Sequence, residues 1–73
     1  MTSSLEAREA TERVQGALLR LTPAHREVVI LRHFLEMSYD EIAGTLTIPE
    51  KTVKSRLYEA RQRLSELLPQ EAA

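Results

Sequence analysis

The chain of 73 residues lacks several features that define large classes of proteins. It has no cysteine, so neither a disulfide bond nor a cysteine-based metal site can form. Its two glycines, Gly16 and Gly44, both lie within helical patterns, so there is no glycine-rich phosphate loop. No apolar run approaches the ~20 residues of a membrane span, and there is no signal-peptide pattern. These absences favour a small soluble protein of the cytoplasm that does not enter a membrane.

Residues for catalysis or metal binding are also scarce. His25 and His33 lie eight positions apart without an HExxH-like partner, and each is expected to be a partly exposed helix residue. No Ser-His-acid arrangement is visible, and Glu6, Glu9 and Glu12 are typical of a solvated helix face. The sequence therefore predicts a protein that is not an enzyme and that binds no metal and no cofactor.

Caps, prolines and apolar spacing predict an all-helical chain. Capping boxes of the form Ser-x-x-Glu begin at Ser3 and at Ser38, each just before a periodic apolar segment. Thr22 can cap another helix whose first position is Pro23, where a missing N–H is harmless. The four predicted helices lie near residues 4–20, 23–35, 39–46 and 50–68.

Apolar stripes on these helices predict one hydrophobic core. The second helix is apolar over much of its girth and is expected at the centre of the domain. Its inner residues are Ala24, Val28, Leu31 and Leu35, widened by Ile30 and Phe34. The other stripes are Ala7, Ala10, Val14, Ala17, Leu18 and Leu21; Tyr39, Ile42, Ala43 and Leu46; and Val53, Leu57, Ala60, Leu64 and Leu68. We expect a single domain over residues 1–73, with residues 1–3 and 69–73 frayed.

The distribution of charge is more informative than the total of −1. Residues 1–50 carry a net charge of −3 and residues 64–73 a net charge of −2. Residues 51–63 carry +4, because five basic side chains there face only one acid. The positive charge thus gathers in one helix, which favours a local surface for binding anions.

That basic helix follows a short helix after a three-residue break, as in a helix-turn-helix that binds DNA. At 100° per residue its outward face carries Lys51, Ser55, Tyr58, Glu59 and Gln62, with Thr52, Lys54 and Arg56 at the flanks. These eight residues are the candidate contacts to double-stranded DNA, since hydroxyls and cations can reach bases or phosphates. A helical protein-interaction module is the alternative that this pattern leaves open.

Several segments resemble region 4 of bacterial sigma factors, and the extracytoplasmic-function group in particular. They are Leu18-Leu19-Arg20-Leu21-Thr22-Pro23, Arg26-Glu27-Val28, Leu31-Arg32, Ser38-Tyr39-Asp40-Glu41-Ile42-Ala43 and Thr52-Val53-Lys54-Ser55-Arg56-Leu57. The resemblance covers about residues 14–68. It implies recognition of the promoter minus-35 element, docking on the beta flap of core RNA polymerase, and capture by an anti-sigma factor. The matching recognition segment makes Thr52, Lys54, Ser55 and Arg56 the leading DNA contacts.

The sequence departs from this pattern at three places. Thr47 stands where glycine is usual in the turn, so the turn is expected to be strained or differently shaped. Lys51 also replaces a common glycine and adds a charge close to the DNA. Tyr58-Glu59 replaces a frequent His-Arg pair, so Glu59 could repel the DNA backbone or accept a hydrogen bond from a cytosine amino group.

Two alternatives remain beside the sigma-factor hypothesis. The effector domain of LuxR-type response regulators shares a four-helix layout and a Glu-Lys-Thr-Val-Lys segment, although Tyr39 and Ser55-Arg56-Leu57 fit sigma factors better. The other alternative is an adaptor for a protein partner. A sigma factor also needs a separate region that melts and recognises the minus-10 element, and 73 residues cannot hold both. We therefore expect an excised domain or a truncated relative. We also expect it to act as a monomer.

Overall fold

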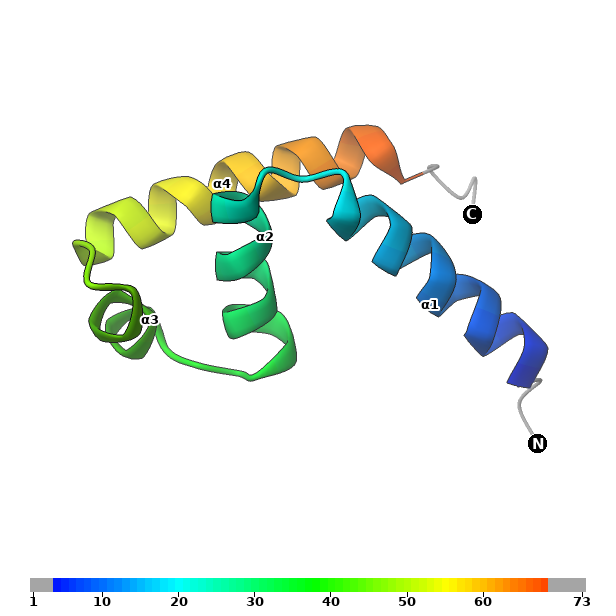
Figure 1. The fold of residues 1–73 in the computed structure, drawn as a ribbon, viewed down its shortest axis with the longest axis horizontal. Coiled ribbons are helices and arrows are strands. Elements are labelled where there is room, and N and C mark those ends of the chain that lie inside the picture. Colours follow the sequence, from blue (N-terminus) through cyan, green and yellow to red (C-terminus); the bar gives the residue numbers. More distant parts are fainter. Residues whose placement is uncertain (1–3, 69–73) are drawn as a thin grey trace.

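Local sequence signals set the helices of the computed structural model, which describes residues 4–68 (Figure 1). The described helices are α1 (Ser4–Leu19), α2 (Pro23–Val29), the π-helix η1 (Ile30–Phe34), α3 (Tyr39–Leu46) and α4 (Glu50–Leu67). The all-helical prediction is confirmed. When α2 and η1 are taken together as the predicted second helix, each predicted boundary lies within about one residue of the observed one. The predicted cap at Ser3 and the predicted frayed segments 1–3 and 69–73 lie outside the described residues.

The two caps within the described chain have the predicted geometry. The Thr22 hydroxyl accepts a hydrogen bond from the His25 backbone N–H at 3.3 Å, and Pro23 occupies the first turn of α2. At the start of α3, the Ser38 hydroxyl accepts from the Glu41 N–H at 3.1 Å. The Glu41 carboxylate in turn accepts from the Ser38 N–H at 2.8 Å, which completes the capping box.

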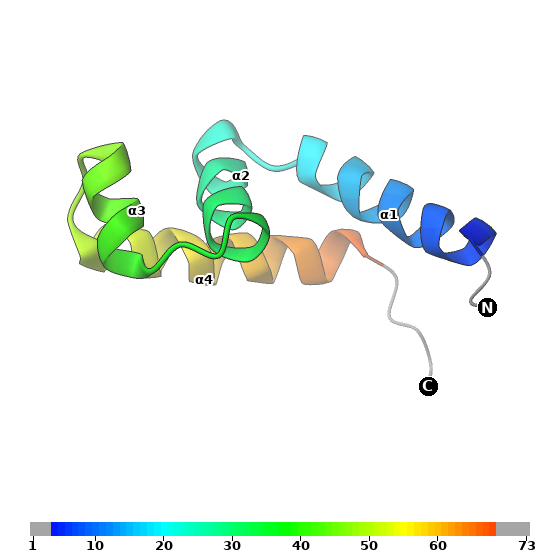
Figure 2. The ribbon, with the colours of Figure 1, turned by 90° about the horizontal axis from the view of Figure 1, so that it is seen from below.

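The core lies where α2 and α3 pack against α4, and the first turn of α2 crosses close to the middle of α4 (Figures 1 and 2). The cluster of buried side chains consists of Leu18, Leu21, Val28, Val29, Ile42, Val53, Leu57 and Ala60. The predicted inward stripe of α3 is therefore confirmed, and that of α4 is confirmed except at its end, where Leu67 packs against the cluster in place of Leu68. Their partly buried members, such as Leu46 and Leu64, pack around the cluster.

The predicted core stripe of the second helix is partly wrong. Val28 is buried, but Leu31 is only half-buried, and Phe34 and Leu35 are 57% and 61% exposed. The cause is a π-helical turn, in which the Leu35 N–H donates to the Ile30 carbonyl five residues earlier at 3.1 Å. Such a turn rotates less per residue than an α-helix, so later side chains leave the inner stripe. Val29, which the spacing did not predict, is buried instead.

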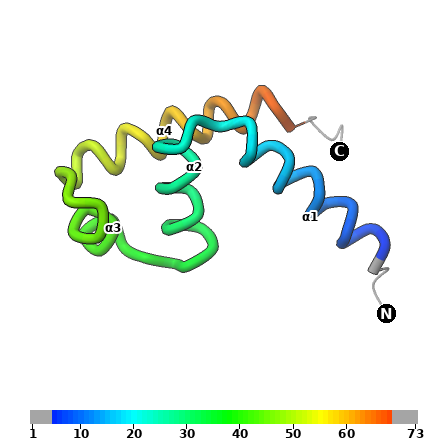
Figure 3. The backbone as a smooth tube through the Cα atoms, viewed as in Figure 1, coloured from blue at the N-terminus to red at the C-terminus, as the bar shows by residue number. Residues whose placement is uncertain are grey.

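The first helix contributes less to the core than its apolar stripe predicted. Only Ala17 and Leu18 of α1 are buried, together with Leu21 just beyond it, while Ala7, Ala10 and Val14 are exposed. Towards its N-terminus, α1 diverges from α2 and α4 (Figure 3). The radius of gyration of 13.8 Å accordingly exceeds the value of about 11 Å that a compact chain of this length would have.

Arg26 joins α1 to the remaining helices. Its Nε donates to the Leu18 carbonyl at 2.9 Å, and its Nη2 donates to the carbonyls of Leu21 at 2.9 Å and Leu19 at 3.3 Å. The last carbonyls of a helix have no partner within the helix, so one guanidinium here caps the C-terminal end of α1. Sequence reasoning had placed Arg26 only in a motif and missed this role.

Candidate nucleic-acid interface

The corner between α3 and α4 is made by a left-handed residue. Thr47 has φ 58° and ψ 49°, and the Ile48 N–H donates to the Ala43 carbonyl at 3.1 Å. This is the hydrogen bond of a Schellman motif, whose left-handed position usually holds glycine. A β-branched residue is strained in that conformation. Of the two outcomes expected for Thr47, the structure shows the strained turn.

α4 presents the predicted outward face to solvent. Its buried side is formed by Val53, Leu57 and Ala60. The side chains of Lys51, Lys54, Ser55, Tyr58, Glu59 and Gln62 are exposed, and those of Thr52 and Arg56 are half-buried at the flanks. The structure therefore brings all eight candidate residues to the solvent-facing side of one helix. An exposed polar face on the second helix of such a pair is the kind of surface that can enter a major groove.

One flank of α4 carries a small group of cations around an aromatic ring. The Lys54 ammonium lies 5.8 Å from the centre of the Tyr39 ring, and the Arg32 guanidinium lies 4.9 Å from it. Arg32 also donates to the Met37 carbonyl at 2.9 Å, which fixes its position. Cation–π contacts of this kind are worth about 0.5–1 kcal/mol at exposed sites. Tyr39 at the start of α3 thereby helps to orient Lys54.

Further along the same flank, Arg32, His33, Glu36 and Arg61 line a shallow depression of about 460 Å³. Partial desolvation, followed by repulsion from Arg61 and then Arg32, lowers the pKa of His33 from its ordinary value of 6.5. All four lining side chains are polar, whereas small-molecule pockets are mostly apolar. The depression therefore extends the charged surface beside α4 and does not resemble a cofactor site.

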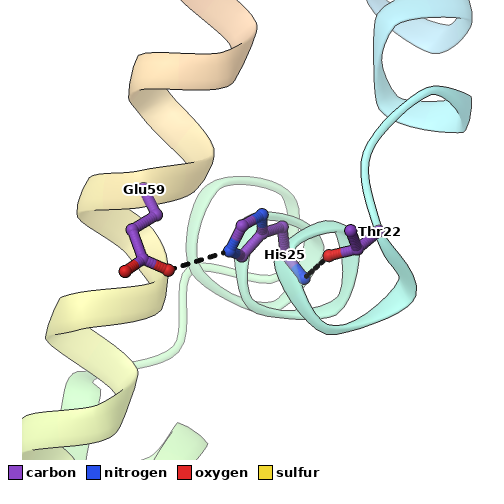
Figure 4. A network of polar contacts seen from close by, with 3 residues as sticks. All are labelled: Thr22, His25 and Glu59. Carbon is purple, nitrogen blue, oxygen red and sulfur yellow. Dashed lines mark hydrogen bonds and ion pairs between the residues drawn. The ribbon is translucent and has the colours of Figure 1, made fainter.

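The opposite flank of α4 is tied to α2. Glu59 Oε1 lies 3.1 Å from His25 Nε2, and these two residues are 34 positions apart in the chain (Figure 4). Sequence reasoning considered Glu59 only as a group facing DNA and His25 only as a partly exposed helix residue. No local pattern could have paired them, because their contact depends on how α2 crosses α4.

The described part of the chain, residues 4–68, shows neither a metal-binding cluster nor a membrane-spanning helix. It contains no group of three or more histidine, cysteine, aspartate or glutamate side chains placed to hold a metal ion. Within the same residues no helix combines the length and hydrophobicity that crossing a bilayer requires.

The fold and the exposed polar face of α4 define a helix-turn-helix domain. The chain belongs to the family of sigma-70, region 4, whose model matches residues 11–64. It is 46% identical over 55 residues to an RNA polymerase sigma-E factor of Streptomyces antibioticus, an alignment covering 75% of this chain and 31% of that protein. The relatives of this chain carry the names of RNA polymerase sigma factors.

Two further relatives show the same relationship. The extracytoplasmic-function sigma factor SigW of Bacillus subtilis is 35% identical over 60 residues, covering 82% of this chain and 32% of the relative. The sigma factor NccH of Alcaligenes xylosoxydans xylosoxydans is 39% identical over 64 residues, covering 88% and 34%. The chain thus spans about a third of the length of these relatives. The family match decides between the two DNA-binding hypotheses in favour of the sigma factor and against the response regulator.

Proposed function

We propose that residues 1–73 act as one domain that recognises the minus-35 element of promoters, as region 4 of a sigma factor that directs RNA polymerase. The observation that carries the proposal is the exposed hydroxyl and basic face of α4, placed by a helix-turn-helix corner. Relatives whose names include RNA polymerase sigma factor support it. The domain would act as a monomer in the cytoplasm, where promoter DNA and polymerase are found.

Roles within α4 follow from the position of each side chain. Ser55 and Lys51, near the centre of the outward face, would contact bases, with Tyr58 and Gln62 further along the groove. Thr52, Lys54 and Arg56 lie at the flanks and would hold phosphates. Lys54 is the clearest phosphate ligand, because its ammonium is already oriented over the Tyr39 ring.

A second surface would serve protein partners, which the resemblance suggests are the beta flap of polymerase and an anti-sigma factor. Ile30, Phe34 and Leu35 are 37%, 57% and 61% exposed, and they lie on the short segment formed by η1 and the residue that follows it. Neighbouring exposed apolar side chains on a small domain are typical of an interaction site. Partner contact there would leave the outward face of α4 open to DNA.

The DNA-binding proposal can be tested by enriching duplexes from a randomised pool with the 73-residue chain and titrating the enriched duplex at several salt concentrations. One basic helix can neutralise only a few phosphates. A plot of the logarithm of the association constant against the logarithm of the salt concentration should therefore have a slope of about −3 to −5. Lys54→Ala should weaken all sequences alike and reduce that slope by about one. Ser55→Ala and Lys51→Ala should change the preferred base, with about 1–3 kcal/mol at stake for a direct contact.

Arg8→Ala provides a matched control, because it removes a cation from the exposed surface of α1 at a distance from α4. It should change neither the slope nor the base preference. A folded chain that enriches no sequence and shifts no DNA in a gel would contradict the proposal and favour the adaptor hypothesis. If Lys54→Ala relaxed preference at one base pair while Ser55→Ala weakened every duplex equally, the assigned face of α4 would be wrong.

A further inference from the structure

Glu59 is the one acidic side chain among residues 51–63, where five cations surround it in sequence. It lies exposed on the helix that carries the proposed DNA contacts. An anion free to approach phosphates would oppose binding that depends on neutralising those phosphates. The domain therefore needs either a use for this carboxylate in DNA recognition or a means of keeping it from the backbone.

The structure provides such a means in His25. Its Nε2 atom lies 3.1 Å from Glu59 Oε1, and its side chain is 22% exposed against 59% for Glu59. A carboxylate can only accept hydrogen bonds, so Nε2 must carry the proton and donate it in this contact. Figure 4 shows the Glu59 side chain directed across the space between α4 and α2, towards the imidazole.

The imidazole is itself held in place by the start of α2. The His25 backbone N–H donates to the Thr22 hydroxyl at 3.3 Å, so the residue belongs to a capped first turn (Figure 4). Arg26, the next residue, is fixed by three carbonyls at the end of α1. The backbone on both sides of His25 is thus held in place by hydrogen bonds, so its imidazole can donate to Glu59 from a defined position.

We propose that His25 is a positioning residue for DNA binding, which holds the Glu59 carboxylate against α2 so that this anion neither repels the phosphate backbone nor contacts a base. The inference rests on the proposed function, because it requires α4 to enter DNA. It replaces the two roles first considered for Glu59, repulsion and acceptance from cytosine, by a contact within the protein. Removal of His25 releases the carboxylate and makes it repulsive.

A double-mutant cycle on the 73-residue chain tests this assignment, with the duplex enriched by the wild-type chain as the probe. His25→Ala should raise the dissociation constant by about threefold, which is within the range found for single electrostatic interactions at exposed sites. In the Glu59→Gln background the same substitution should change it by no more than about 1.5-fold. His25→Gln, whose amide can still donate to the carboxylate, should retain most of the wild-type affinity.

His33→Ala is the matched control. It removes the other histidine, which belongs to η1 and lies near Arg61, on the side of α4 away from Glu59. Its effect should be the same with and without Glu59→Gln. Thermal melts followed by circular dichroism establish which variants are folded. If His25→Ala does not fold, His25→Gln takes its place and is measured in the wild-type chain and in Glu59→Gln. Because glutamine still offers a donor, His25→Gln should change the dissociation constant by no more than about 1.5-fold in either the wild-type or the Glu59→Gln background. A larger loss of affinity that is the same in both backgrounds would overturn the proposal.

Other outcomes separate the competing roles of the pair. An equal effect of His25→Ala in both backgrounds, or no effect in either, would overturn the positioning role while leaving DNA binding intact. A Glu59→Gln variant that loses discrimination at one base pair would show that the carboxylate contacts a base. If the wild-type chain enriches no DNA sequence, the proposed function fails and this inference fails with it.

Discussion

The turn residue Thr47 should limit the stability of the domain. It is exposed, and its φ of 58° places a β-branched side chain in the left-handed region. The Schellman hydrogen bond from Ile48 to Ala43 requires this backbone conformation, so Thr47 cannot relax without opening the corner. Replacing Thr47 by glycine should therefore remove strain while preserving the helix-turn-helix geometry.

The size of the effect follows from two opposing terms. The left-handed conformation costs a non-glycine residue about 1–2 kcal/mol. Glycine loses more chain entropy on folding, which opposes the gain by about 0.4–1 kcal/mol. The net increase in the free energy of unfolding should be about 0.5–1 kcal/mol, equivalent to a rise of about 2–8 °C in Tm for a domain of this size.

Thermal and urea unfolding monitored by circular dichroism would measure this change. Thr45→Gly is a matched control, because it makes the same substitution at an exposed, right-handed position of α3. It should lower stability by a few tenths of a kcal/mol up to about 1 kcal/mol. Thr47→Ala keeps the left-handed penalty and should change stability by less than about 0.5 kcal/mol. A Thr47→Gly variant that melts below the wild type would refute the argument from strain.

Three further predictions concern the core, the pH dependence and the α1 connection. Leu57→Ala, at a side chain that is 1% exposed, should reduce the free energy of unfolding by about 2–5 kcal/mol. Leu31→Ala, at a half-buried site, should reduce it by less. Equal losses for the two variants in urea titrations would show that the core is misplaced. Since the pKa of His33 is lowered below 6.5 in the folded state, the unfolded chain binds more protons. Stability should therefore decrease as pH falls through that value, and His33→Gln should flatten the curve; a curve unchanged by the substitution would contradict the assignment. Arg26→Met should cost about 1–3 kcal/mol, because the carbonyls of Leu19 and Leu21 lose the donor that the guanidinium provides. Hydrogen exchange of α1 amides that did not accelerate would argue against the cap.

Much of the fold could be predicted because its signals act over three or four residues. The Ser38 capping box and the Thr22 cap are contacts between near neighbours in the chain, and both were found as predicted. The helical period likewise placed Val53 and Leu57 inward and Ser55 outward on α4. Helix boundaries and the candidate face of the site were therefore determined by the sequence itself.

Burial on the second helix could not be predicted in the same way. Its apolar residues cover most of the circumference, so periodicity alone does not say which of them the neighbours cover. The π-helical turn at Ile30–Phe34 then exposes Leu35, and the divergence of α1 leaves Val14 without a core to join. Packing against α4 decided these positions, with Val29 taken into the core.

The sequence by itself determined the four helices, the corner at Thr47 and the basic outer face of α4, because each depends on local backbone geometry and side-chain period. Only the tertiary structure decided which partners the polar side chains take. Arg26 reaches the end of the preceding helix, and the imidazole of His25 meets the carboxylate of Glu59 across 34 positions of chain. Such contacts are set by the angles at which helices cross, and those angles arise from the packing of the whole core.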